Sequence, residues 1–521
     1  MATKVCSVCH ATKFNIDFSG AQLKQKANKR KCKNCVEAVS IDKYKELLSW
    51  LGVSPHGKIS AVNIVELGPE FRGVKANRDF KAGDVIIKIA ESHMMTYDNA
   101  LTQPDIQSLV STNKLSLDDH HSVLALFLLA ERSKGSASFW YPYISLLPVN
   151  YTTVPLFFDL EDIHRLYGST SSDMIAVRLK SLEDDWDKIK ESLKSTTSTS
   201  PLSSCTFEDF TWARVVVISR IFGYEIKGRK TEALVPLADM LNHSESPGTC
   251  WKFNETDRCF QIDAERRIYS GNNIMDTYGP KCNKRYFVNY GFTLPDNEIW
   301  NQASLYFNLD RVMELQHDDK DTQMIKRLIL GKQGRSIDDG YSGYSIMVAQ
   351  GLEQRVTTDG LFRFEVPTTM RADSLVDTLF SFARTLVANK DELTHITEVL
   401  KRDDPRQNHH HNQYLGFKLS VINERNERAV LALIACEARN RLTDFLTSME
   451  DDIHSLSNAV LYSNEYNITN ILVSEKQVLQ HYIDLDKLVT SMSTIRLARR
   501  ALLMNKTTRE YGRNTWAHMH E

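Results

Sequence analysis

Apolar positions change their spacing several times along the chain, and each change marks a different kind of element. Tyrosine and leucines recur at helical spacing in IDKYKELLSWLG, which predicts a helix from residue 41. The runs ISAVNIVEL and DVIIKI are β-rich and flank the turn-dense connection GPEFRGVKANRDFKAG. The pattern therefore predicts a helix followed by the start of a β-hairpin.

Helical spacing then dominates a long stretch of the chain. HSVLALFLLAERS, LEDIHRLY, DMIAVRLKSLEDDWDKIKESL and FEDFTWARVVVISRIFG predict helices, the last of them ending at Gly223. The Ser/Thr-rich STTSTSPLSS predicts a flexible surface linker. Because β-rich patterns return afterwards, we expect one β-containing domain interrupted by a helical insert at about residues 105–218.

Beyond about residue 301 the pattern is mostly helical. SLVDTLFSFARTL, NERAVLALIACEARNRL and ITNILVSEKQVLQHYI each carry one apolar stripe, which is typical of helices that pack together. The run His409-His410-His411 predicts a solvated loop. Together these patterns predict an α+β protein with an all-α C-terminal lobe over residues 301–521.

The stretch from Leu234 to Phe292 combines the least ordinary features. LVPLADMLNHSESPGTC places Asn242 and His243 at the end of an apolar run whose one charge is Asp239, and IMDTYGPKCNKRYFVNYGF places a glycine directly after Tyr278. Glycine after tyrosine suggests backbone that bends tightly or that another group approaches closely. By themselves, these features are equally compatible with two hairpins of a buried sheet.

Composition narrows the class of protein. A chain of 521 residues predicts two or three domains, and its net charge of −2 leaves any nucleic-acid role to a local basic segment. The N-terminus has no apolar signal segment, and no apolar stretch is long enough to span a membrane. Nine cysteines without an export signal predict reduced thiols or metal ligands, in the cytoplasm or nucleus.

Two paired cysteines stand near the N-terminus. Cys6 and Cys9 form one C-x2-C pair, Cys32 and Cys35 form another, and 22 residues separate them. Four thiolates complete a tetrahedral structural zinc site, although His10 could substitute for one of them. Such a closed site leaves no position for catalysis. We therefore expect a zinc-binding module over residues 1–40.

A basic segment, KQKANKRKCKNC, runs into the second cysteine pair. It could contact nucleic-acid phosphates or an acidic protein surface, or it could be a solvated face that keeps the module soluble. The module also resembles the four-cysteine zinc modules of heterochromatin adaptor proteins, which implies a recruiting role.

Three blocks carry a resemblance to SET-domain methyltransferases of the Rubisco large-subunit methyltransferase type. LLAERSKGSASFWYPYISLLP resembles the family's insert block, PLADMLNHS its cofactor and knot segment, and TYGPKCNKRYFVNYGF its catalytic tyrosine segment. The resemblance implies a pseudo-knotted SET domain over residues 41–300, split by the insert. It also implies that the C-terminal lobe binds the protein substrate.

The resemblance further implies S-adenosylmethionine as the cofactor and Tyr278 as the catalytic residue. Arg220 is expected to meet the cofactor carboxylate, for which a planar guanidinium is suited. Backbone contacts are expected from Glu70 and Arg72 at the cofactor's amino acid end. The remaining positions are Asp239, Met240, Leu241, Asn242 and His243 along the cofactor, with the main chain of the last two at the adenine, and Tyr290 and Phe292 along the substrate channel.

Two positions bear on the modified residue. The family's actin-histidine branch has a tryptophan before the cofactor-segment aspartate and an asparagine two residues after the cofactor arginine, where this chain has Ala238 and Phe222. Both choices favour an apolar channel and a lysine substrate over histidine. Three departures from the family pattern, Phe71, Asp276 and Cys282, also leave open a catalytically weak scaffold that acts through its zinc module.

Overall fold

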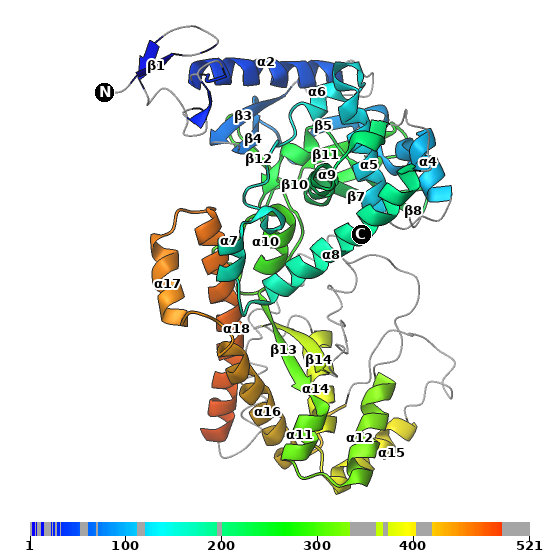
Figure 1. The fold of residues 1–521 in the computed structure, drawn as a ribbon, viewed down its shortest axis with the longest axis vertical. Helices are drawn as coiled ribbons and strands as arrows, with labels where there is room; N and C mark the ends of the chain where they lie inside the picture. Colours follow the sequence, from blue (N-terminus) through cyan, green and yellow to red (C-terminus); the bar gives the residue numbers. More distant parts are fainter. Residues whose placement is uncertain are drawn as a thin grey trace. The chain divides into compact units, whose positions relative to one another are not determined.

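Two compact units make up the chain in the computed structural model. The first contains residues 1–151 and 180–280, and the second contains residues 152–179 and 281–521 (Figure 1). Residues 281–300 thus group with the C-terminal unit and not with the predicted SET region. The structure describes residues 33–52, 61–68, 71–111, 120–194, 201–333, 361–367, 373–402 and 419–491, together with short pieces of residues 3–31.

Strands of the first unit form three small sheets and one separate pair. Their orders are β3-β4-β12-β9, β10-β11-β5 and β6-β8-β7, and β1 pairs with β2. The strands are β1 (Thr3–Val5), β2 (Thr12–Phe14), β3 (Val62–Gly68), β4 (Phe71–Ala76), β5 (Val85–Ala90), β6 (Met95–Thr96), β7 (Ile221–Ile226), β8 (Arg229–Leu234), β9 (Asn242–His243), β10 (Thr249–Asn254), β11 (Cys259–Ala264) and β12 (Asn273–Asp276).

Hydrogen bonds join strands from both sides of the helical insert. β5 pairs with β11 and β6 pairs with β8, both antiparallel. β4 pairs antiparallel with β12, which in turn pairs in parallel with β9. A single domain interrupted by a helical segment requires such long-range pairs. The connection predicted as turns between the first two strand-like runs contains a strand of its own, β4.

The helices of the first unit follow the apolar patterns of the sequence. They are α2 (Lys33–Gly52), α3 (Tyr97–Leu101), α4 (Pro104–Ser111), α5 (His120–Ser133), α6 (Tyr141–Ile144) and α9 (Phe207–Arg220), and α8 (Thr170–Lys194) has residues in both units. The Thr206 side chain accepts a hydrogen bond from the Asp209 amide and forms a capping box at the start of α9. The prediction that this helix reaches Gly223 was wrong, because the chain enters β7 at Ile221.

The second unit is mainly helical. Its helices are α7 (Leu160–Arg165), α10 (Asn283–Tyr290), α11 (Leu309–Leu315), α12 (Lys320–Gln333), α14 (Asp373–Leu386), α15 (Lys390–Arg402), α16 (Glu424–Leu442), α17 (Met449–Asn458) and α18 (Asn464–Ser491). The apolar stripes of α14, α16 and α18 supply much of one buried core, as the sequence predicts. Helix α10 rules out the alternative of a second hairpin at this end of the Leu234–Phe292 stretch.

The prediction of an all-α C-terminal lobe was wrong in one respect. β13 (Gln302–Asn308) and β14 (Leu361–Pro367) form an antiparallel pair in which Leu305 lies opposite Phe364. Alternating apolar residues on these strands enter the same core, where the Phe364 and Phe382 ring centroids lie 4.7 Å apart. Alternate apolar side chains of these strands lie in the core, and this alternation favours strands over helices in an otherwise helical unit.

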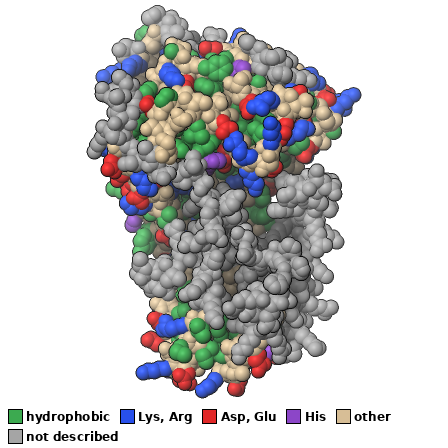
Figure 2. All heavy atoms as spheres, turned by 90° about the vertical axis from the view of Figure 1, so that its right-hand side faces the viewer, with side chains coloured by type: hydrophobic (Ala, Val, Ile, Leu, Met, Phe, Trp, Pro, Cys, Tyr) green, Lys and Arg blue, Asp and Glu red, His purple; other side chains and the backbone are tan. Residues whose placement is uncertain are grey.

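Charged side chains of both signs lie on the surface. Figure 2 shows acidic and basic side chains interspersed on the face it draws, consistent with a net charge of −2. Among the described residues, no helix is both long and apolar enough to cross a membrane.

Candidate active site

Strands β9 and β12 bring the two halves of the Leu234–Phe292 stretch together. Leu237 is buried and has a φ of +71°. A leucine is strained in this backbone conformation, so the surrounding packing must hold it there. A 3₁₀ turn, η6 (Ala238–Met240), follows it and leads into β9. In the parallel pair, Asn242 lies opposite Met275 and His243 opposite Asp276. The strand partner of His243, Asp276, precedes Tyr278 by two residues, so the pairing brings the Asn-His pair close to Tyr278.

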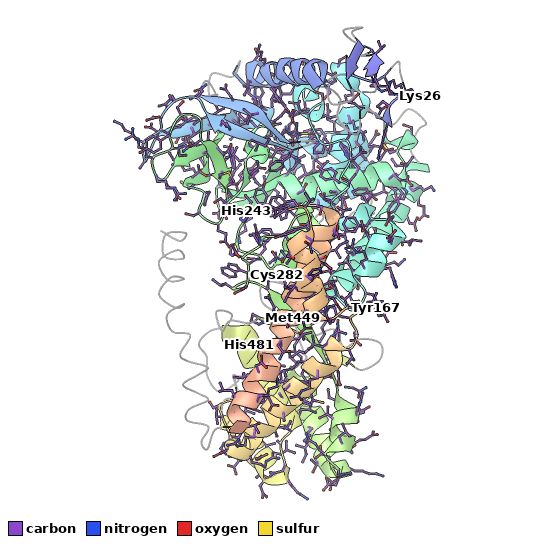
Figure 3. All side chains as sticks on the ribbon, turned by 90° about the vertical axis from the view of Figure 1, so that its left-hand side faces the viewer. Lys26, Tyr167, His243, Cys282, Met449 and His481 are labelled. Atoms are coloured by element: carbon purple, nitrogen blue, oxygen red, sulfur yellow. The ribbon has the colours of Figure 1, made fainter. Side chains whose placement is uncertain are left out.

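Tyr278 is held at both its backbone and its hydroxyl group. Its backbone N–H donates to Nδ1 of His243 at 3.1 Å, and its hydroxyl donates to the Leu241 carbonyl at 2.9 Å. The Tyr278 and His243 rings lie 5.2 Å apart, and His243 is labelled in Figure 3. The phenol oxygen is thus fixed beside the cofactor segment predicted from the sequence.

A buried ion pair lies on the same segment. Arg220 Nη1 donates to Oδ2 of Asp239 at 3.0 Å and to its carbonyl at 3.1 Å. The Tyr143 hydroxyl donates to the same Oδ2 at 2.8 Å, and Nε of Arg220 lies 3.4 Å from the Tyr151 hydroxyl. Burial, followed by the charge of Asp239, raises the pKa of Tyr143 well above its ordinary value, so this phenol stays a donor.

Strand β4 contributes Arg72, whose backbone carbonyl is bonded to Asn242. Nδ2 of Asn242 donates to the Arg72 carbonyl at 2.9 Å, so the side chain of Asn242 ties β9 to β4. Phe71 is the first residue of β4, and about half of it is exposed.

Burial changes the charge expected at Asp276. Its side chain is buried, and this desolvation raises its pKa to about 6 against the opposing hydrogen bond from the Thr277 amide. At pH 7 the carboxyl is therefore still mostly ionised, as the sequence suggests, but it takes up its proton near pH 6 instead of near pH 4.

We predict that Asp276→Asn stabilises the protein more at pH 7.5 than at pH 4. Burial raises the pKa of Asp276 from 3.8 to about 6 in the folded state, so the folded protein tolerates the protonated carboxyl but is destabilised by the ionised one. The native protein therefore loses stability as the pH rises through 6, and the neutral asparagine avoids that loss. The two-unit difference corresponds to about 3 kcal/mol at most. Urea unfolding of both proteins at the two pH values measures it, and an equal difference at both values would contradict the assignment.

The two residues of the first unit that were predicted to line a substrate channel lie in apolar surroundings. Ala238 is buried in η6. Phe222 lies on β7, where its ring centroid is 4.9 Å from that of Phe260 and 5.6 Å from that of Trp251. These contacts make Phe222 part of an aromatic cluster, which is compatible with an apolar channel wall but also accounts for the residue by simple packing.

The other two residues predicted for the channel, Tyr290 and Phe292, belong to the second unit. The Tyr290 and Phe292 ring centroids lie 6.1 Å apart, and Tyr286 stacks on Phe292 at 5.3 Å. Nζ of Lys281 lies 5.9 Å from the Tyr290 ring centroid, and burial lowers the pKa of this lysine to about 8. Cys282 is buried at the start of α10 (Figure 3). The aromatic rings thus form one cluster that can face a cation.

Several predicted residues fall outside the described part of the chain. They include Glu70, Cys6, Cys9, Cys32 and the histidine run, and the Cys35 side chain is also outside it although its backbone lies in α2. In the described ranges, no group of three or more His, Cys, Asp or Glu side chains could hold a metal ion. The zinc module stays a prediction.

Buried polar atoms at the Arg220–Asp239 pair fit the amino acid end of S-adenosylmethionine. Oδ1 of Asp239 is buried and has no hydrogen-bond partner among the described residues. An ammonium group would satisfy that oxygen, and a carboxylate would satisfy nearby guanidinium N–H groups. The residues that would hold this end are therefore Arg220 and Asp239, with His243 and Asn242 farther along the segment.

Sequence reasoning missed one contributor to this site. Tyr143 stands inside a block that carries the family resemblance, yet its bond to Asp239 spans 96 residues. A tyrosine within an apolar block was the available signal, because a buried phenol needs a partner.

Two parts of the chain match known protein families. Residues 72–279 match the SET domain family model, and residues 347–479 match the Rubisco LSMT substrate-binding model. Structures of LSMT are similar in fold: the SET domain of LSMT bound to lysine and AdoHcy has a TM-score of 0.64 at 18% identity, covering 88% of this chain and 95% of that chain. Rubisco LSMT bound to AdoMet has a TM-score of 0.63 at 18% identity, covering 88% and 96%.

Similar sequences include proteins with different named activities. SET domain-containing protein 4 of Artemia parthenogenetica is 28% identical over 50% of this chain and 65% of its own length. The actin-histidine N-methyltransferase of Danio rerio is 28% identical over 50% and 44%, and a ribosomal lysine N-methyltransferase of Schizosaccharomyces pombe is 29% identical over 43% and 40%. The chain thus spans less than two thirds of each of these relatives.

Proposed function

We propose that this chain, which combines a SET domain with a Rubisco LSMT substrate-binding domain, is an S-adenosylmethionine-dependent protein-lysine N-methyltransferase. The observation that carries the proposal is the placement of Tyr278. Its hydroxyl is bonded to the Leu241 carbonyl, on the segment that also holds the Arg220–Asp239 pair. A phenol fixed beside a polar pocket of this kind can position an amine next to a bound cofactor.

The reaction requires a neutral lysine amine aimed in line with the donated methyl group. S-adenosylmethionine would supply that methyl group in electrophilic form. A lysine with an ordinary pKa of about 10.4 arrives protonated, and an apolar, aromatic channel favours loss of the proton. The Tyr278 oxygen can then accept a hydrogen bond from the amine and hold its direction. The Leu241 carbonyl can also accept a weak CH···O contact from a methyl group.

Ala238 and Phe222 support lysine as the modified residue. Ala238 is small and buried, and Phe222 lies among aromatic rings, so neither offers a polar group to an imidazole. Histidine methylation is the second candidate, because relatives of similar identity include actin-histidine N-methyltransferases as well as a ribosomal lysine N-methyltransferase. The protein substrate is proposed to bind the C-terminal lobe.

Calorimetry with S-adenosylmethionine distinguishes an enzyme from a scaffold. An enzyme with this pocket binds the cofactor in the micromolar range or tighter, and a catalytically weak scaffold with a defective pocket does not. Absence of binding at high micromolar cofactor would contradict the proposed function.

We further propose that Cys6, Cys9, Cys32 and Cys35 bind one structural zinc ion, and that the basic segment around them recruits an acidic protein or nucleic acid in the cytoplasm or nucleus. The C-x2-C spacing and the short length of this segment support the proposal. The other five cysteines are free thiols in the described structure.

We predict that replacing Cys6 and Cys9 together by serine removes about one zinc ion per chain while methyl transfer to peptides is retained. Metal analysis of the purified full-length protein and an activity assay check both statements. Cys250→Ser with Cys436→Ser is the matched control, because both of those thiols are exposed. Unchanged zinc content, or loss of the SET fold in the first variant, would refute a separable zinc module.

A further inference from the structure

Arg72 places a guanidinium group close to the Asp239 pocket. Its side chain comes from β4, and one of its Nη atoms donates to the Leu146 carbonyl. Its own carbonyl is held by Nδ2 of Asn242. Both its backbone and its side chain are therefore fixed by residues of the first unit.

The segment that begins with α6 links Arg72 to the buried ion pair. Tyr143 donates to Asp239, and three residues later the Leu146 carbonyl accepts from Arg72. Asn242, three residues after Asp239, contacts Arg72 from the other side. The contacts at Leu146 and Tyr143 place the Arg72 guanidinium near the Arg220–Asp239 pair, and Asn242 holds the Arg72 backbone.

Charges in this pocket do not balance. Among the described residues, Asp239 is the one carboxylate within ion-pair distance of either guanidinium, and it pairs with Arg220. Burial, and then the nearby charge of Arg220, lower the pKa of Arg72 below its ordinary value. Two half-buried cations near one carboxylate favour a second anion.

We propose that the Arg72 side chain, together with Arg220, binds the carboxylate at the amino acid end of the cofactor. A guanidinium presents paired N–H donors that match a carboxylate. The Arg72 side chain, and not only its backbone, then determines affinity for a cofactor that carries this carboxylate. The inference rests on the proposed function, since it assumes that S-adenosylmethionine binds at Asp239.

The test compares two ligands that differ only in that carboxylate: S-adenosylmethionine and decarboxylated S-adenosylmethionine. Calorimetry measures both dissociation constants for the wild-type full chain, Arg72→Met and Arg72→Lys. We expect Arg72→Met to raise the constant for S-adenosylmethionine by roughly 10- to 100-fold, since it removes a charge-assisted contact. Affinity for the decarboxylated ligand should stay within about 3-fold, and Arg72→Lys should give an intermediate loss.

Arg267→Met is the matched control, because that arginine is 58% exposed on its side chain and pairs with Asp79 away from the pocket. It should change neither constant. Equal weakening of both ligands by Arg72→Met would show a structural role, and no weakening of either would show no role; both results overturn the inference. If Arg72→Met does not fold in a thermal unfolding control, the same ratio measured for Arg72→Lys decides. Failure of the wild type to bind S-adenosylmethionine would instead remove the proposed function itself.

Discussion

Tyr278→Phe is expected to lower the rate of methyl transfer by about 100-fold or more while leaving cofactor affinity within about 3-fold. The variant keeps the aromatic ring beside His243 and removes only the hydroxyl that donates to the Leu241 carbonyl. That hydroxyl is the group proposed to orient the amine, so its loss affects transfer and not the pocket at Asp239. Single-turnover transfer and calorimetry measure the two quantities separately.

Tyr269→Phe is the control for this experiment. Tyr269 lies in the same unit and is 53% exposed, so loss of its hydroxyl should change neither quantity. Unchanged transfer in Tyr278→Phe would remove this tyrosine from the mechanism. Loss of cofactor binding together with transfer would show that its hydroxyl maintains the cofactor segment instead.

Lys284→Met is expected to destabilise the second unit by about 3–5 kcal/mol, because it removes one partner from a buried network of charges. Nζ of Lys284 contacts Glu365 at 2.8 Å and the Thr170 hydroxyl at 3.0 Å, and its side chain is 3% exposed. Burial opposes the charge on Glu365, but Lys284 and then Arg363 outweigh it and lower its pKa to about 2. Without Lys284, the buried acids Glu365 and Glu475 lose a shared cation.

Urea unfolding of the full chain, followed by a probe in the second unit, measures this effect. Lys487→Met is the matched control, because its side chain is 64% exposed and its pair with Asp484 should contribute little. A change below about 1 kcal/mol for Lys284→Met would contradict the interpretation of this network as a stabilising one.

The sequence indicated which residues of the candidate site lie together better than it indicated the contacts that hold them. Asn242, His243 and Tyr278 stand in short blocks with recognisable spacing, and the structure brings them together through β9 and β12. The bond from Tyr143 to Asp239 depends on a tertiary contact between the helical insert and the segment that follows it. No local pattern encodes such a contact, so the missing partners could only be seen in the fold.

Two errors in the predicted fold have identifiable causes. The apolar run before Phe222 fits a helix and a strand equally well, so the change from α9 to β7 at Ile221 left no mark in the periodicity. The strands β13 and β14 are short and separated by residues 309–360, so neither looked like half of a hairpin. In both places, tertiary pairing and burial determined the element.

Reaction with S-adenosylmethionine carrying a labelled methyl group tests the central claim most directly. The full-length protein is incubated with cell extract, and the labelled product is located by mass spectrometry, with Tyr278→Phe as the inactive comparison. The proposed function predicts label on the side-chain amine of a lysine, dependent on Tyr278. Label on a histidine nitrogen would contradict the lysine assignment, and absence of labelling by a protein that binds the cofactor would contradict the proposal of an active enzyme.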